Sequence, residues 1–246
     1  MKDNFSTQAK LYAQFRPTYP QTLYDFVLEG LHSHDLAWDC ATGNGQVAVV
    51  LAGHFAAVKA TDISQKQLDE AKPAPTIEYL ISSAEQTPFP DQCFDLITVG
   101  QALHWFDFER FNQEVRRIAK PHATIAVWGY SLLSISPEID PVVNHFYREI
   151  VGPYWDPERR HTEDHYAQIP FPYQDVEEKI FPMQTQWNFE QLIGYFRTWS
   201  SVQKYIKLNG NDPVEVLSET LQPLWGEPQT LRTITFPVFV KKGKVL

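Results

Sequence analysis

Residues 39–46 read Asp39-Cys40-Ala41-Thr42-Gly43-Asn44-Gly45-Gln46 and continue a short apolar run that begins at 35. The two glycines permit a tight turn and let the main chain approach a ligand closely. The segment that follows has helical spacing, so its first turn would present free amide donors. Taken alone, such a turn can also be a simple helix cap, but a strand, a glycine turn and a helix in this order favour a ligand-binding βα unit.

The same alternation continues along the first half of the chain. Apolar runs at 35–40, 56–61, 77–82, 94–100 and 123–129 predict strands, and helical spacing appears at 44–55, 64–72 and 106–120. Ser64 can cap the second helix, and Pro121 follows the third. Two further strands are expected at 180–187 and 231–241. The pattern predicts an α/β fold, a Rossmann-like, doubly wound, mostly parallel seven-stranded sheet.

Two carboxylates flank the glycine turn in this arrangement. Asp62 follows the second strand, close to the ~20-residue spacing at which an acidic residue binds ribose hydroxyls in dinucleotide folds. The alternative is that Asp62 caps the helix beginning near Ser64, and both roles are compatible. Asp39 ends the first strand, where its charge would repel a pyrophosphate but attract the ammonium of an amino-acid-bearing cofactor, directly or through water.

The charge of Asp39 decides between two cofactors. Gly43-x-Gly45-x-x-Ala48 also satisfies the relaxed nicotinamide fingerprint, so the glycines alone leave NAD open. A carboxylate at this position favours S-adenosylmethionine over NAD.

Asp39-x-Ala41-x-Gly43-x-Gly45-Gln46 resembles motif I of the class I S-adenosylmethionine-dependent methyltransferases, and the 94–97 segment resembles their fourth strand. The 82–90 segment is similar to the one after the third strand in the type 11 subgroup, and the match covers 36–128 well. Segments 12–20, 102–107 and 199–205 resemble the branch that contains trans-aconitate methyltransferases. Two positions depart from the family pattern: Ala41 replaces its first glycine, and Ser83 replaces a frequent acidic residue.

The resemblance implies a role for each matching position. Gly43 and Gly45 would line the methionine portion of the cofactor, and Gln101 would face its methionine end. Asp62 and Ile63 would hold the ribose and adenine, while Ser83 and Ala84 flank the base. Because Ser83 replaces the acidic residue, contact to the adenine amine would be weaker, or made through Glu85 or a backbone carbonyl. The predicted cofactor-binding residues are Arg16, Asp39, Ala41, Gly43, Gly45, Gln46, Asp62, Ile63, Ser83, Ala84, Glu85 and Gln101.

Methyl transfer from a sulfonium is an in-line displacement that needs mainly positioning and exclusion of water. If the acceptor is a hydroxyl or amine, His104 is the candidate base; if it is a carboxylate, His104 could orient or neutralise it. The alternative is a histidine that packs against Trp105. Arg16 could clamp a carboxylate of cofactor or substrate, or lie on the surface. The predicted substrate residues are Tyr12, Tyr19, Trp105, Arg148 and Trp155, and no metal site is expected.

The 246 residues, 43% of them hydrophobic, predict a single methyltransferase domain. Its parts are an N-terminal flap at 1–34, a cofactor-binding core at 35–129, an inserted helical or loop cap for the substrate at 130–176, and C-terminal helices with closing strands at 177–246. Helices are expected at 189–207 and 213–225 in this last part.

Composition limits the partners. The net charge of -9 without a basic run argues against nucleic acid. No segment has the ~20 apolar residues of a membrane span or the pattern of a signal peptide, and two cysteines make no disulfide framework, so a cytoplasmic protein is expected. Monomer and homodimer stay open. We therefore expect methyl transfer to a small molecule, with a carboxylate as one candidate acceptor and S-adenosylhomocysteine as product; the alternatives are an NAD(P)-dependent oxidoreductase and a non-catalytic S-adenosylmethionine-binding module.

Overall fold

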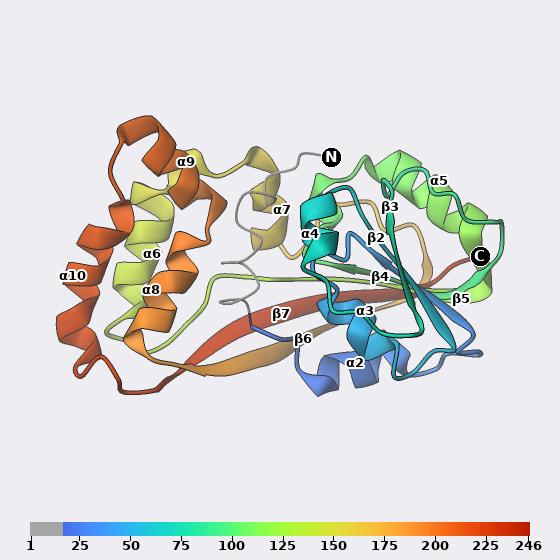
Figure 1. Cartoon of the computed structure of the whole chain (residues 1–246), viewed down its shortest axis with the longest axis horizontal. Helices are drawn as coiled ribbons and strands as arrows, with labels where there is room; N and C mark the ends of the chain where they lie inside the picture. Colours follow the sequence, from blue (N-terminus) through green and yellow to red (C-terminus); the bar gives the residue numbers. More distant parts are fainter. Residues whose placement is uncertain (1–16) are drawn as a thin grey trace.

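A computed structural model describes residues 17–246 of the chain. Its centre is a seven-stranded sheet with the strand order β3-β2-β1-β4-β5-β7-β6 (Figure 1). The strands are β1 (Leu36–Cys40), β2 (Ala57–Asp62), β3 (Ile77–Ile81), β4 (Phe94–Gly100), β5 (Ala119–Tyr130), β6 (Gln174–Trp187) and β7 (Arg232–Lys244). The first five strands are parallel, and β7 runs antiparallel to both β5 and β6. The predicted Rossmann-like, mostly parallel sheet is confirmed.

Helices cover both faces of the sheet, so successive residues of a central strand enter different apolar cores. Ala37 packs in one cluster with α2 (Gln21–Leu28) and α3 (Gln46–Leu51), whereas Trp38 packs in another with α5 (Phe108–Ile118). Figure 1 shows α2 and α3 on the side of the sheet opposite α5. Burial on both faces explains why the strands read as nearly continuous apolar runs.

The helices of the core are shorter than the predicted ones. The helices expected at 44–55 and 64–72 are α3 and α4 (Gln65–Asp69). Ser64 stands at the N-cap position of α4, but its side chain makes no capping hydrogen bond; the Asp62 carboxylate accepts from the Ser64 amide instead. The helix expected at 106–120 ends at Ile118 because β5 begins at Ala119, and Pro121 lies inside that strand.

Two separate inserts build the cap. The first, between β5 and β6, contains α6 (Asp140–His145), η3 (Phe146–Ile150), η4 (Gly152–Tyr154), η5 (Pro157–Arg159) and α7 (Arg160–Glu163). The second, between β6 and β7, contains α8 (Phe189–Arg197), α9 (Ser200–Asn209) and α10 (Pro213–Trp225). Figure 1 shows α6, α8, α9 and α10 gathered at one end of the long strands β6 and β7. Since β6 begins at Gln174, the strand expected at 180–187 is longer than predicted.

Aromatic side chains join the two inserts. Trp199, at the N-cap of α9, has extended backbone angles that separate α8 from α9 within the 189–207 segment. Its ring is 5.5 Å from that of Trp155 and 5.6 Å from that of Tyr147, both in the first insert. Phe146 similarly lies 6.2 Å from Phe196 of α8. Pairs of this kind contribute about 0.5–1.5 kcal/mol each beyond their buried area, so the helices after β6 are part of the same cap. The single-domain organisation stays a prediction.

Candidate active site

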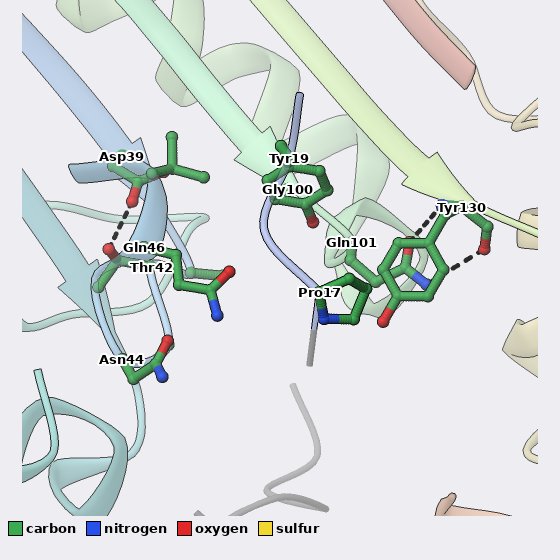
Figure 2. A pocket seen from close by; sticks show the side chains of 12 residues that line it. Pro17, Tyr19, Asp39, Thr42, Asn44, Gln46, Gly100, Gln101 and Tyr130 are labelled. Carbon is green, nitrogen blue, oxygen red and sulfur yellow. Dashed lines mark hydrogen bonds between the residues drawn. The ribbon is translucent and has the colours of Figure 1, made fainter. Parts of the chain in front are cut away.

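A pocket opens at the carboxyl ends of β1 and β4, where open α/β sheets bind their ligands. The space it encloses, including space open to solvent, is about 540 Å³. The lining residues are Pro17, Tyr19, Asp39, Ala41, Thr42, Gly43, Asn44, Gln46, Val47, Gly100, Gln101 and Tyr130. Figure 2 shows the turn after β1 on one side, with Tyr19, Gln101 and Tyr130 on the other.

The turn after β1 requires backbone conformations that suit glycine. Gly43 has φ +57° and Gly45 has φ +79°, both in the left-handed region. A Cβ on Gly45 would also collide with the hydroxyl of Tyr79. Ala41 adopts φ +55° at the position where the resemblance places a glycine, and Gln101 adopts φ +58° directly after β4. Left-handed residues other than glycine cost on the order of 1–3 kcal/mol and concentrate at functional sites.

Asp39 is buried and holds the turn after β1 in place through hydrogen bonds. One carboxylate oxygen accepts hydrogen bonds from Thr42 Oγ1 (2.5 Å) and the Ala48 amide (3.1 Å), and the other accepts from Thr98 Oγ1 (3.0 Å). Burial raises the pKa of Asp39 to about 7, although these hydrogen bonds act in the opposite direction. The charge of nearby Asp62 adds to the increase. A cation arriving in the pocket would therefore favour the ionised form of Asp39.

Asp62 fastens the turn to the end of β2. Its Oδ2 accepts from the Gly43 amide and its Oδ1 from the Ser64 amide, both at 2.9 Å. Asp62 does not line the pocket, but its hydrogen bond holds Gly43, which does.

The structure brings part of the predicted cofactor set together. Tyr19, predicted for the substrate, lines the same pocket as Asp39, Ala41, Gly43, Gln46 and Gln101. Ile63 follows Asp62 at the end of β2 and does not line the pocket. Arg16 and Tyr12 lie outside the described residues.

The segment after β3 is also outside the pocket lining. Ser83 Oγ donates to the Gln86 carbonyl at 3.4 Å, and Ala84 is buried. Glu85 Oε1 accepts from the Asp107 amide at 3.1 Å, which fixes this segment to the start of α5. The predicted adenine contacts of these residues stay predictions.

His104 lies in η2 (Leu103–Trp105), away from the pocket lining. It is 4% exposed, and its Nδ1 is 3.0 Å from the hydroxyl of Tyr166, which is itself fully buried. Burial lowers the pKa of His104 to about 3, with further lowering by the charges of Arg159 and His161. A buried, weakly basic imidazole does not suit a general base, so the geometry favours the alternative of a packing histidine, with its ring 4.8 Å from that of Trp105.

The remaining predicted substrate residues occupy different surroundings. Trp105 is half-buried against His104, and Trp155 belongs to the aromatic cluster of the cap. Arg148 is exposed on η3, whereas the preceding Tyr147 is buried. The structure therefore does not bring Arg148 to the pocket.

Several lining residues were not predicted: Pro17, Thr42, Asn44, Val47, Gly100 and Tyr130. Gly100 and Tyr130 end β4 and β5, so inspecting every strand end would have found them. A Cβ on Gly100 would approach the Trp128 ring at 3.1 Å and the Tyr19 hydroxyl at 3.4 Å. Thr98, which holds Asp39, carries no distinguishing signal in the sequence.

Comparisons with known proteins identify the family. A model of the methyltransferase domain matches residues 38–127. A Dictyostelium discoideum protein described as a methyltransferase is 32% identical over 250 residues, spanning 98% of this chain and 95% of its own length. The chain belongs to the class I S-adenosylmethionine-dependent methyltransferases. A structure described as a type II methyltransferase from Anaeromyxobacter dehalogenans has a TM-score of 0.87 and 34% identity, covering 94% of this methyltransferase and 99% of that chain.

A more distant structure, described as a methyltransferase from Bacillus halodurans, is 20% identical with a TM-score of 0.52 and shows the shared fold alone. The family assignment excludes the alternative of a nicotinamide oxidoreductase and establishes S-adenosylmethionine as the cofactor. The glycine turn and the buried carboxylate that lines the pocket fit this cofactor. Across residues 17–246, no helix has the length and apolar character to traverse a bilayer.

Proposed function

We propose that this methyltransferase methylates a small molecule that carries a carboxylate and is held between the pocket and the cap. The observation that carries the proposal is the composition of the pocket lining. Within residues 17–246, the titratable side chains that line it are Tyr19, Asp39 and Tyr130, and the carboxylate of Asp39 is occupied by the turn. An acceptor that is already ionised needs no base, so a carboxylate or similarly nucleophilic group suits this lining best.

The protein residues would hold the cofactor through complementary charge and close backbone contact. Asp39 would attract the ammonium, directly or through water, while Gly43 and Gly45 let the main chain approach the methionine portion. Asp62, which holds Gly43 at the end of β2, would accept hydrogen bonds from the ribose hydroxyls. Bound S-adenosylmethionine supplies a sulfonium-linked methyl group that is already electrophilic.

The side of the pocket that faces the methyl acceptor would be formed by Tyr19, Gln101 and Tyr130. Gln101 is fixed because its Oε1 accepts from the Tyr130 amide at 2.9 Å (Figure 2). These side chains can exclude water and orient the acceptor, which are the contributions that an in-line displacement mainly requires. The resemblance of 102–107 and 199–205 to the trans-aconitate branch supports an acidic acceptor.

The test combines binding with transfer. S-adenosylhomocysteine and S-adenosylmethionine are titrated by calorimetry, and transfer of a labelled methyl group to small carboxylic acids is compared with transfer to their amides. We expect micromolar cofactor binding that is lost in Gly43→Val and Asp62→Ala, and methyl esters formed from acids alone. Cofactor binding without transfer to any acid would support a non-catalytic binding module, and transfer to the amides would contradict the carboxylate proposal.

A further inference from the structure

Arg159, at the end of η5, is a half-buried cation inside the aromatic part of the cap. Its guanidinium lies 5.0 Å from the ring centre of Trp155 and 6.0 Å from that of Tyr147. Its Nε donates to the Tyr147 hydroxyl at 3.3 Å. Within the part of the chain that the structure describes, no carboxylate lies within ion-pair distance of Arg159. This arrangement leaves the terminal nitrogens without a counter-charge.

Arg159, at the end of η5, lies beside η2, the turn that follows β4. The charge of Arg159 contributes to the lowered pKa of His104, which lies in η2. Residues of η5 also contact residues of η2. Tyr130, which ends β5 and lines the cofactor pocket, lies close enough to Arg159 to affect its pKa. Electrostatic effects of this kind are strong only over short distances. Arg159 therefore lies on the cap side of the space beyond β4 and β5.

A structural role explains Arg159 poorly. Glu163, whose carboxylate shares the Tyr147 hydroxyl with Arg159, is used by Tyr147, which donates to Glu163 Oε1 at 2.6 Å. Partly desolvating a cation without a counter-charge is unfavourable. In the adjoining segment, Thr162 Oγ1 and His161 Nδ1 are buried and have no hydrogen-bond partner among residues 17–246. Buried polar atoms in native proteins nearly always have partners, which points to a polar ligand or water between cap and sheet.

We propose that Arg159 binds an anionic carboxylate of the methyl acceptor, while Trp155 and Tyr147 pack against its flat apolar part. This inference rests on the proposed function and adds the residue that selects the acceptor. A planar guanidinium fork matches the two oxygens of a carboxylate, and the stacked rings hold the fork in place. Ion pairing withdraws electron density from the bound oxygens, so the anchored group is distinct from the group that receives the methyl. The acceptor therefore carries at least two functional groups, one of them anionic.

Binding to the complete protein saturated with S-adenosylhomocysteine tests the proposal. The probe is cinnamate, whose flat apolar body carries one carboxylate, and cinnamamide is the uncharged isostere. We expect Arg159→Gln to weaken cinnamate binding about 30-fold or more, since hydrogen bonds to charged groups are the strong ones, and to leave cinnamamide binding unchanged. Arg160→Gln is the matched control, because Arg160 is exposed and adjacent in sequence. Arg159→Lys keeps the charge without the fork and should give an intermediate loss.

The outcomes separate this inference from the proposed function. Equal cinnamate affinity in Arg159→Gln and Arg160→Gln would overturn the role of Arg159, as would a failure of the cofactor-bound wild type to bind cinnamate. Preference for phenyl phosphate over cinnamate would overturn the assignment of a carboxylate. If the wild-type protein did not bind S-adenosylhomocysteine at all, the proposed function itself would be contradicted. Unchanged cofactor affinity and unfolding midpoint in Arg159→Lys and Arg160→Gln show that a loss of cinnamate binding is local.

Discussion

Asp39→Asn removes a charge from the centre of the site with little change in shape. The variant amide oxygen can accept from Thr42 and the Ala48 amide as the carboxylate oxygen does. The amide nitrogen would face Thr98, whose hydroxyl can accept this hydrogen bond while donating to the Trp38 carbonyl, 3.3 Å away. The turn should therefore persist, and the variant isolates the electrostatic role of Asp39.

The expected effect on cofactor binding follows from the pKa of Asp39, which burial raises to about 7. If the cofactor ammonium binds the ionised form, the competent fraction of the protein falls as pH falls below 7. Affinity for S-adenosylhomocysteine should then drop about 25-fold between about pH 7.5 and about pH 5.5. Asp39→Asn should bind weakly at both values, with no such dependence on pH.

The contribution of Asp39 to the free energy of unfolding should depend on pH in the opposite direction to cofactor affinity. Folded Asp39 holds its proton more tightly than the unfolded chain, so it makes the free energy of unfolding fall as pH rises from about 4 to about 7, by no more than about 4 kcal/mol. His104 acts the other way, since burial lowers its pKa to about 3: its contribution is complete above about pH 6.5 and is lost as pH falls toward 3. In Asp39→Asn only the destabilising effect of His104 remains as pH falls. The free energy of unfolding of the variant should therefore decrease more in acid than that of the wild type.

Calorimetric titration and urea unfolding across this pH range measure both effects. Asp91→Asn, which changes an exposed carboxylate, is the matched control and should reproduce the wild-type dependence of binding on pH. Parallel binding curves for wild type and Asp39→Asn would refute the proposed contact between Asp39 and the ammonium. Parallel unfolding curves would refute the raised pKa.

Three further predictions concern single positions in or beside the site. Gly45→Ala should abolish measurable S-adenosylhomocysteine binding and lower stability by more than about 1 kcal/mol, because the left-handed angle is combined with a collision against Tyr79; Gly210→Ala, with a similar angle and open space, should show the backbone cost alone with full binding. Asp62→Asn should weaken the same ligand about tenfold or more by calorimetry, since one acceptor oxygen becomes a donor, and full affinity would remove Asp62 from the site. His104→Gln should reduce kcat less than about threefold while lowering the unfolding midpoint; a loss of 10²-fold or more, the usual contribution of a general base, would restore the predicted catalytic role.

The cofactor half of the fold could be predicted because its signals are local. The strand at 94–100 matched β4 at both ends, since a run buried on both faces is apolar throughout its length. The length of β5 was underestimated because Lys120, Pro121 and His122 interrupt the apolar pattern, although Ala119 already pairs with Phe94 before a shift in register, and pairing with β4 resumes at Thr124. Pro121 is tolerated in the strand, so its usual meaning as a helix terminator was misleading here.

The cap could not be predicted as one unit, because its contacts join residues that are far apart in sequence. Trp199 separates α8 from α9 and packs against Tyr147 and Trp155, and no local pattern reveals this contact. The exposed position of Arg148 could not be predicted for a similar reason. Arg148 lies in a π-helical stretch, whose register differs from that of an α-helix, and it is exposed, whereas Arg159 is half-buried.

On the proposal above, two charges of opposite sign, the buried Asp39 and the half-buried Arg159, would set the direction of the site. Asp39 lies beneath the turn on the sheet side, and Arg159 lies in the aromatic cluster on the cap side. A ligand with an ammonium group is favoured at the first position, and a ligand with an anionic group is favoured at the second. A ligand bound in the reverse orientation would place its ammonium group beside Arg159 and its anionic group beside Asp39, so like charges would meet at both ends. Charge placement would thus set the order of donor and acceptor across the pocket, before any contact with the reacting atoms.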